Sequence, residues 1–117
     1  MNHLHINVPS VPEAQAFFER YFGYQRLFEA GGTLFMKDAS DFLLALDPCE
    51  PGEEVKFPEW FHFGVCRSDP EWARDLYARM KADGVQFVDE LQEYENAAVF
   101  FCRGPGGYSI EVRGNKV

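Results

Sequence analysis

Residues 6–24 read INVPSVPEAQAFFERYFGY, and residues 63–85 read FGVCRSDPEWARDLYARMKADGV. Each stretch passes from a short apolar run through Ser-x-Pro-Glu into an amphipathic pattern that ends at a glycine. A unit that repeats within a chain indicates copies of one supersecondary structure, and it has to be recognised before any other feature. The sequence therefore predicts two similar halves, and such halves usually form the two sides of one cleft.

Both predicted helices carry start and stop signals. Each opens on a Ser-x-x-Glu capping box, whose hydroxyl and carboxylate satisfy backbone amides that have no partner within the helix. The boxes are Ser10 with Glu13 and Ser68 with Glu71. Pro12 and Pro70 fall in the first turn, where a missing N–H costs nothing. Gly23 and Gly84 follow as the expected left-handed caps.

Three strand candidates follow each helix. They are residues 24–30, 33–37 and 42–46 in the first half, and 85–90, 97–103 and 108–113 in the second. Turn residues separate them, as in hairpins. The segment 48–58 (PCEPGEEVKFP) is rich in proline and charge and predicts a linker. We expect one domain of two modules, 1–47 and 59–117, each with the order strand, helix and three strands.

Composition narrows the classes of partner. The formal charge of −8 and the pI near 4.8 argue against nucleic acid and anionic membranes, and favour a cationic small molecule over an anionic one. An acidic surface also simply keeps a protein in solution. Cys49, Cys66 and Cys102 have no ligand-like spacing and predict free thiols in a reducing cytosol. No signal-like or membrane-spanning stretch is present, so we expect a cytoplasmic protein.

Alternation along the strands predicts which side chains share a face. Polar faces are expected on two strands, with His3, His5 and Asn7 on the first and Trp60, His62 and Gly64 on the fifth. Matching the apolar rows on the opposite faces pairs His3 with Trp60 and His5 with His62.

The last strand contributes a carboxylate to the same kind of face. Ile110 and Val112 are apolar, which leaves Glu111 and Arg113 on the polar side. The fourth strand, aligned in the same way, places Ala45 at the position of Glu111. Three histidines and one glutamate are therefore predicted to face one cleft.

Two segments resemble the vicinal oxygen chelate superfamily, which includes glyoxalase I, fosfomycin-resistance transferases, extradiol dioxygenases and bleomycin-resistance proteins. They are NHLHINV (2–8) with the helix that follows, and FFCRGPGGYSIEVRG (100–114), which is similar to the family's closing hairpin and glutamate-bearing strand. The family hairpin usually reads Asp-Pro-Asp-Gly, whereas residues 104–107 here read Gly-Pro-Gly-Gly. The resemblance implies an α+β fold of two βαβββ modules, curved as half-barrels around a central cleft with the helices outside. It also implies a homodimer.

The resemblance implies metal ligands at four positions, which map to His3, Ala45, Trp60 and Glu111. Only His3 and Glu111 of these can bind a metal, and Trp60 stands where a histidine is usual. A set of His3 or His5 with His62 and Glu111 would restore two histidines and one carboxylate. Such a set suits one divalent ion of Fe, Mn, Ni or Zn. Without metal, the same histidines would line an apolar cavity or bond to their neighbours.

Other candidates also have two interpretations. Glu111 is a catalytic general base, or it is an ion-pair partner of Arg113, Arg26 or Arg103. Arg113 binds a substrate carboxylate, or it is solvated at the strand's end. Trp60 is expected to stack on a planar ligand in the cleft.

Three functions are consistent with these residues. The first is a metal-dependent lyase or oxygenase that acts on a small oxygen-rich metabolite. The second is a metal-free protein of the bleomycin-resistance type that binds a small cationic, aromatic drug. The third is an accessory dimer whose cleft is vestigial. The histidine cluster favours an enzyme, whereas the acidic charge and the aromatic residues favour a binding protein.

Overall fold

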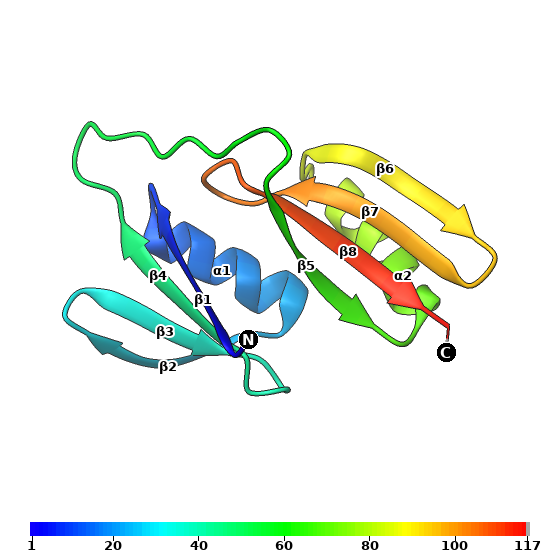
Figure 1. Ribbon diagram of the computed structural model, residues 1–117, viewed down its shortest axis with the longest axis horizontal. Coiled ribbons are helices and arrows are strands. Elements are labelled where there is room, and N and C mark those ends of the chain that lie inside the picture. The colour runs from blue at the N-terminus through cyan, green and yellow to red at the C-terminus, as the bar shows by residue number, and fades with distance from the viewer. Residues whose placement is uncertain (117) are drawn as a thin grey trace. The chain divides into compact units, whose positions relative to one another are not determined.

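Figure 1 shows the computed structural model of the protein, in which residues 1–116 are described. The chain divides into two compact units, here called module one (Met1–Lys56) and module two (from Phe57 onward). Module one contains β1 (His3–Val8), α1 (Val11–Phe22), β2 (Gln25–Ala30), β3 (Thr33–Lys37) and β4 (Leu43–Pro48). Module two contains β5 (His62–Arg67), α2 (Pro70–Ala82), β6 (Phe87–Tyr94), β7 (Ala97–Arg103) and β8 (Ser109–Asn115).

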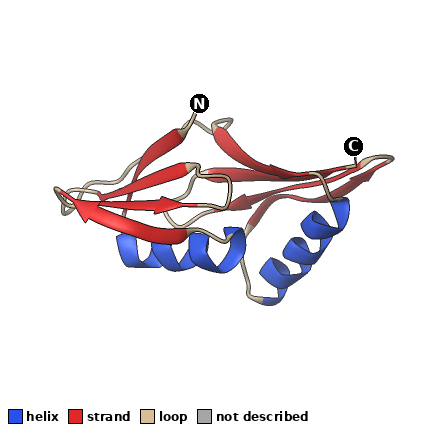
Figure 2. Ribbon diagram, turned by 90° about the horizontal axis from the view of Figure 1, so that it is seen from below, coloured by secondary structure: helices blue, strands red, loops and turns tan. Residues whose placement is uncertain are grey.

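Each module is a four-stranded sheet with one helix. The strand order is β1-β4-β3-β2 in module one and β5-β8-β7-β6 in module two, and the first pair in each order is parallel. Within each module the helix covers one face of the sheet (Figure 2). The predicted α+β fold of two βαβββ modules is confirmed, and both sheets are open rather than closed barrels. No helix within residues 1–116 has the length and apolar character needed to cross a membrane.

The core of module one follows from alternation and helical periodicity. One sheet face buries Ile6, Val8, Leu34, Met36, Leu44 and Leu46, whereas Ala45, which is also buried, lies on the other face. Helix α1 buries Ala14, Phe18, Tyr21 and Phe22. The amide of Glu13 donates to the Ser10 hydroxyl at 3.3 Å, and Gly23 has φ 69°, so both predicted ends of α1 are confirmed.

The start of α2 differs from the prediction by one residue. Its N-cap is Asp69 rather than Ser68, and the Asp69 carboxylate accepts the amide of Glu71 at 3.0 Å. The corresponding residue in module one is Val11, whose side chain accepts no hydrogen bond, so there the serine caps the helix. Gly84 follows the C-cap residue Asp83 and has φ 81°, which is the left-handed conformation predicted for it.

Several strand boundaries differ from the predicted ones, those of β5 and β6 among them. Trp60 and Phe61 precede β5 instead of starting it, because the Phe61 amide closes a turn on the Pro58 carbonyl at 3.0 Å. Strand β6 continues to Tyr94, beyond its predicted end at residue 90. The pairing of β6 with β7 has two register irregularities, and that of β2 with β3 has one. Such bulges interrupt the alternation from which strand lengths are predicted.

Candidate functional site

In both modules the sheet face opposite the helix carries the polar side chains. Ala45 pairs with His5 on one side and Phe35 on the other. Glu111 pairs in the same way with Gly64 and Phe101. Ala45 and Glu111 therefore occupy equivalent positions, in agreement with the predicted alignment of β4 and β8.

The same ladders correct the predicted pairing of the histidines. Since His5 lies beside Ala45 and Gly64 lies beside Glu111, the residue equivalent to His3 is His62 and not Trp60. The prediction was shifted by two residues. A two-residue shift keeps every side chain on its predicted face, so alternation alone cannot detect it. The structure thus places a histidine at the same ladder position in both modules.

Module two holds a compact charged cluster of His62, Glu111 and Arg113. Nε2 of His62 lies 3.4 Å from Oε1 of Glu111, and Nε of Arg113 donates to Oε2 at 3.1 Å. The Glu111 side chain is 22% exposed, so this pair with Arg113 is only partly screened by water. Of the three predicted ion-pair partners, Arg113 is the one that contacts Glu111.

The two other arginines have different partners. Arg26 pairs with Glu29 at 3.8 Å, and Arg103 donates to the Gly107 carbonyl at 3.0 Å. Arg113 is not left at a solvated strand end, because its Nη1 also donates to Asn115 Oδ1 at 3.3 Å.

The ring of His62 is held in one tautomer. Its Nδ1 lies 3.2 Å from the Trp60 carbonyl oxygen, which can only accept, so Nδ1 carries the proton. In the neutral ring, Nε2 then presents a lone pair to a carboxylate oxygen of Glu111. Two such atoms at 3.4 Å repel unless a proton or a cation lies between them. Metal-ligating histidines are commonly fixed by this kind of bond to a backbone carbonyl.

The separation of the two atoms suits a shared metal ion. Ligands held about 2.0–2.2 Å from one ion at tetrahedral or octahedral angles lie about 3.0–3.5 Å apart. Gly64 keeps the neighbouring position open, since a Cβ there would lie 3.5 Å from Glu111 Cβ and 4.0 Å from its Oε1. His62 is further supported by an edge-on contact with Phe101, with ring centroids 5.1 Å apart.

Module one holds its two histidines differently from each other. Nδ1 of His3 bonds to Asn2 Oδ1 at 2.7 Å, which leaves Nε2 available as in His62. His5 instead bonds through Nε2 to Oδ2 of Asp47, whose Oδ1 accepts from the Thr33 hydroxyl at 2.7 Å. The Thr33 hydrogen bond, followed by that of His5, lowers the pKa of Asp47. His3 and His5 are therefore not equivalent as ligands.

Sequence reasoning missed Asp47. Its signal was present, because Asp47 lies two residues after Ala45 and so shares the face of His5. Alternation was applied to β4 only as far as Leu46, where the predicted strand ended, whereas the strand continues to Pro48.

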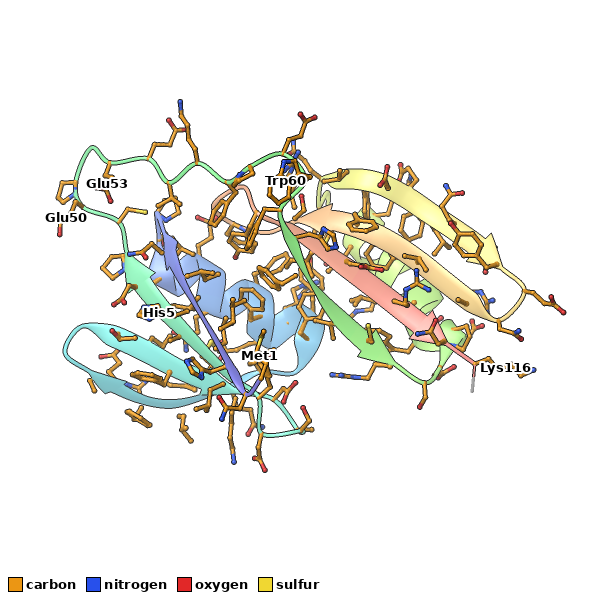
Figure 3. All side chains as sticks on the ribbon, viewed as in Figure 1. Met1, His5, Glu50, Glu53, Trp60 and Lys116 are labelled. Carbon is orange, nitrogen blue, oxygen red and sulfur yellow. The ribbon has the colours of Figure 1, made fainter. Side chains whose placement is uncertain are left out.

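Trp60 does not occupy a strand position. It lies in the turn ahead of β5 and is 80% exposed. Figure 3 labels Trp60 there, and His5 on β1. Trp60 contacts the cluster through its backbone carbonyl, which fixes His62. The expected inward-facing indole is therefore corrected to an exposed one.

No set of three or more His, Cys, Asp or Glu side chains in residues 1–116 is grouped closely enough to bind a metal ion. Module two offers the pair His62 and Glu111.

The model of the Glyoxalase/Bleomycin resistance protein/Dioxygenase superfamily matches residues 1–112. The chain belongs to this superfamily. The predicted resemblance is confirmed, and the match covers both modules.

Solved structures of superfamily members share the fold. A protein described as a possible glyoxalase from Bacillus cereus is 32% identical, with a TM-score of 0.82 and 96% of each chain covered. The fosfomycin resistance protein FosX from Listeria monocytogenes is 15% identical, with a TM-score of 0.81, and 100% of this chain and 91% of that chain are covered. A lactoylglutathione lyase from Agrobacterium tumefaciens is 18% identical, with a TM-score of 0.73 and coverages of 97% and 92%. At these low identities, the last two structures show the fold alone. A search of curated protein sequences found no match to this chain.

Proposed function

We propose that this protein is a divalent-metal-dependent lyase or oxygenase that acts on a small oxygen-rich metabolite, with His62 and Glu111 of module two as protein ligands and His3 as the candidate ligand of module one. The observation that carries the proposal is the His62–Glu111 pair, whose Nε2 and Oε1 atoms face each other at 3.4 Å. The superfamily match and the 32% identity to a protein described as a possible glyoxalase support an enzyme of this kind.

The choice of His3 over His5 rests on their hydrogen bonds. The Nδ1 of His3 is bonded and its Nε2 is available, which is the arrangement found for His62. The Nε2 of His5 is engaged by Asp47. Two imidazoles and one carboxylate form a donor set that suits Fe(II), Mn(II), Ni(II) or Zn(II).

A bound ion of this kind supplies a Lewis acid that polarises neighbouring substrate oxygens. The chain's own residues position the Glu111 carboxylate and offer a hydrogen-bond donor to the substrate. Arg113 holds Oε2 of Glu111 and so aims Oε1 toward His62 as a ligand. With no ion bound, the same carboxylate is our candidate general base. Nη2 of Arg113 has no bonded partner in the described part of the chain and is available to a substrate carboxylate or carbonyl.

Metal content tests the proposal. Untagged protein is incubated with Mn(II), Fe(II), Ni(II) or Zn(II), dialysed, and measured by elemental analysis. We expect about one retained ion per chain, and at least a tenfold loss of affinity in His62→Ala and Glu111→Gln, because each removes a direct ligand. His5→Ala is the matched control and should retain the ion. Equal metal content in wild type and Glu111→Gln, with both folded by circular dichroism, would contradict the proposal.

Exposed Trp60 favours a second candidate function, metal-free binding of a planar cationic ligand by the acidic protein. The protein has two tryptophans, Trp60 and Trp72, and Trp72 is covered by the Arg67 guanidinium at 5.2 Å. Ethidium is a suitable probe. Quenching of tryptophan emission that Trp60→Phe abolishes and Trp72→Phe preserves would support binding, whereas quenching unchanged in Trp60→Phe would exclude this site.

The proposal also covers the oligomeric state of the protein and its location in the cell. We propose a homodimer, which light scattering after gel filtration would detect at twice the chain mass. A cytoplasmic location is supported by three free cysteines, since such thiols persist in reducing compartments.

A further inference from the structure

A hollow of about 470 Å³ lies in module one where α1 begins, between the first turns of the helix, the β2–β3 hairpin and the end of β4. Its volume is in the range of small-molecule sites. It lies on the helix side of the sheet, because its lining residue Leu34 belongs to the buried face and Glu29 pairs with Leu34 in the ladder. The hollow therefore shares no residue with the proposed metal site.

The sequence at the end of β4 explains why the hollow is open. In module two, β8 approaches the start of α2 so closely that a Cβ on Gly114 would collide with backbone atoms of Asp69 and Pro70. Pro48 takes the position of Gly114 in module one, and its ring keeps β4 from approaching α1 in the same way. The hollow is therefore a property of module one and not of the repeated fold.

The walls favour an aliphatic body. Five of the lining residues are apolar, and three of these are prolines, which have rigid rings and no N–H donor. These five are Pro9, Val11, Pro12, Leu34 and Pro48. No aromatic side chain of residues 1–116 lines the hollow, so its walls offer neither a stacking surface nor a cation–π contact.

The charge at the hollow is negative. Glu29 is the charged residue of the lining, and its side chain is 62% exposed. Its Oε1 lies 3.8 Å from Nη2 of Arg26, which is too long for a hydrogen bond. The carboxylate can therefore accept hydrogen bonds from a ligand, and the formal charge of −8 attracts cations to the protein.

The start of α1 does not reverse this preference, although a helix N-terminus favours anions in general. Pro12 has no N–H to donate. The amide of Glu13 donates to the Ser10 hydroxyl at 3.3 Å, and that of Ala14 donates to the Ser10 carbonyl at 3.1 Å. An anion would find at most the Val11 amide, so the hollow is a poor anion site.

We propose that this hollow binds a small aliphatic ammonium ion, with its apolar body against the three prolines and Leu34 and its N–H groups donated to Glu29. Apolar contact supplies affinity, and the charge-assisted hydrogen bond selects a primary or secondary amine. A quaternary ammonium has no N–H to donate and finds no aromatic cage here. The site thus differs in kind from one that stacks a planar cation.

Three probes with one ring separate these contributions. They are cyclohexylmethylammonium, its N,N,N-trimethyl derivative and cyclohexylmethanol, of which only the first has a charged N–H. Each is titrated into the ¹⁵N-labelled full chain by NMR with a chelator present, so that the result is independent of the metal proposal. We expect saturable shifts at the amides of Val11, Gln15 and Gly32, and about fivefold tighter binding of the primary ammonium, which is the upper range for an exposed ion pair.

Three variants provide the controls. Glu29→Gln keeps the shape of the side chain and should abolish the preference for the primary ammonium. Glu93→Gln removes the same charge from β6, at a side chain that is 52% exposed and also paired with an arginine, and should keep the preference. Arg26→Met removes the cation beside Glu29 and should tighten binding of the primary ammonium.

Four results would overturn the proposal. They are equal affinity of the wild type for the three probes, a preference that survives in Glu29→Gln, an equal loss in Glu93→Gln, and shifts that are absent or confined to module two.

Discussion

The two modules share a topology, and the contacts of their helices differ in kind. In module one, Phe18 of α1 packs edge-on against Phe17 and Tyr24, with ring centroids 5.4 and 5.8 Å apart. In module two, ion pairs tie α2 to β6, with Arg74 Nε 2.9 Å from Glu93 Oε2 and Lys81 Nζ 3.1 Å from Glu90 Oε1. Salt screens exposed ion pairs, but it does not weaken apolar burial in this way. Apolar packing also holds α2, which buries Ala73, Leu76 and Met80 and packs Tyr77 against Phe87 of β6.

The start of each helix shows a second difference. In module two, β8 passes so close to α2 that a Cβ on Gly114 would lie 2.3 Å from the Asp69 carbonyl oxygen. The equivalent residue of module one is Pro48, which is exposed. There the start of α1 and Pro48 line an open hollow of about 470 Å³. Module two is therefore closely packed at a place where module one is open.

The largest effect is expected from removing the aromatic support of α1. Phe18 is 1% exposed, so Phe18→Ala should lower the free energy of unfolding by about 3–5 kcal/mol through lost burial and a cavity. Phe28→Ala, at an exposed ring, should cost under about 1.5 kcal/mol. Urea unfolding followed by circular dichroism measures both. Similar costs for the two variants would show that α1 is not held by its aromatic cluster.

Gly114→Ala tests the close packing in module two. Because the added Cβ meets backbone atoms of Asp69 and Pro70, which cannot move aside freely, we expect a loss of about 2–3 kcal/mol. Gly64→Ala, whose Cβ would meet nothing closer than 3.4 Å, is the control and should unfold at a similar urea concentration to wild type. A Gly114→Ala protein as stable as Gly64→Ala would contradict the described packing.

Acid should weaken module one through Asp47. The Thr33 hydrogen bond lowers its pKa in the folded state, so the stabilisation is present above the unfolded carboxyl pKa of about 3.9 and is lost as pH falls through the lower folded value. Thr33→Val should therefore cost about 1 kcal/mol at pH 7, and the difference should shrink below pH 4. Urea unfolding at both pH values measures it, and a difference that grows in acid would contradict the assignment.

The smallest effect is expected from the ion pairs of module two. Hydrogen bonding to Glu93 raises the pKa of Arg74, and the same bond lowers the pKa of Glu93. Arg74→Met should lower the melting temperature slightly in dilute buffer, and the deficit should vanish in 1 M NaCl because salt screens exposed pairs. The Phe18→Ala deficit should persist in the same salt. A salt-independent Arg74→Met deficit would assign the loss to side-chain packing.

Local signals predicted the fold because both halves repeat them. The cap at Ser10 and the left-handed glycines depend on neighbouring residues, so the sequence carries them directly. The sequence did not show which of two adjacent cap-forming residues would start the helix, and the N-cap of α2 is Asp69 and not the predicted Ser68. The register of β5 failed by two residues because alternation fixes a face and not a partner.

The candidate site was predictable in part for the same reason. His62 and Glu111 were found from alternation, and they meet across adjacent strands. The roles of His3 and His5 could not be separated, because the difference lies in partners rather than in spacing. His5 is engaged by Asp47, which is forty-two residues away in the chain. Such a contact exists only once the parallel pair β1 and β4 has formed.

The bulges in β2 and β6 also affect how copies of the protein meet. Both strands are sheet edges, and an edge strand offers unpaired backbone groups to any other extended chain. Each bulge interrupts that row, and β6 adds the charges of Asp89, Glu90 and Glu93. The edges next to exposed Phe28 and Tyr94 are thereby made poor templates for strand addition, which protects a chain rich in aromatic residues from aggregation through its sheets.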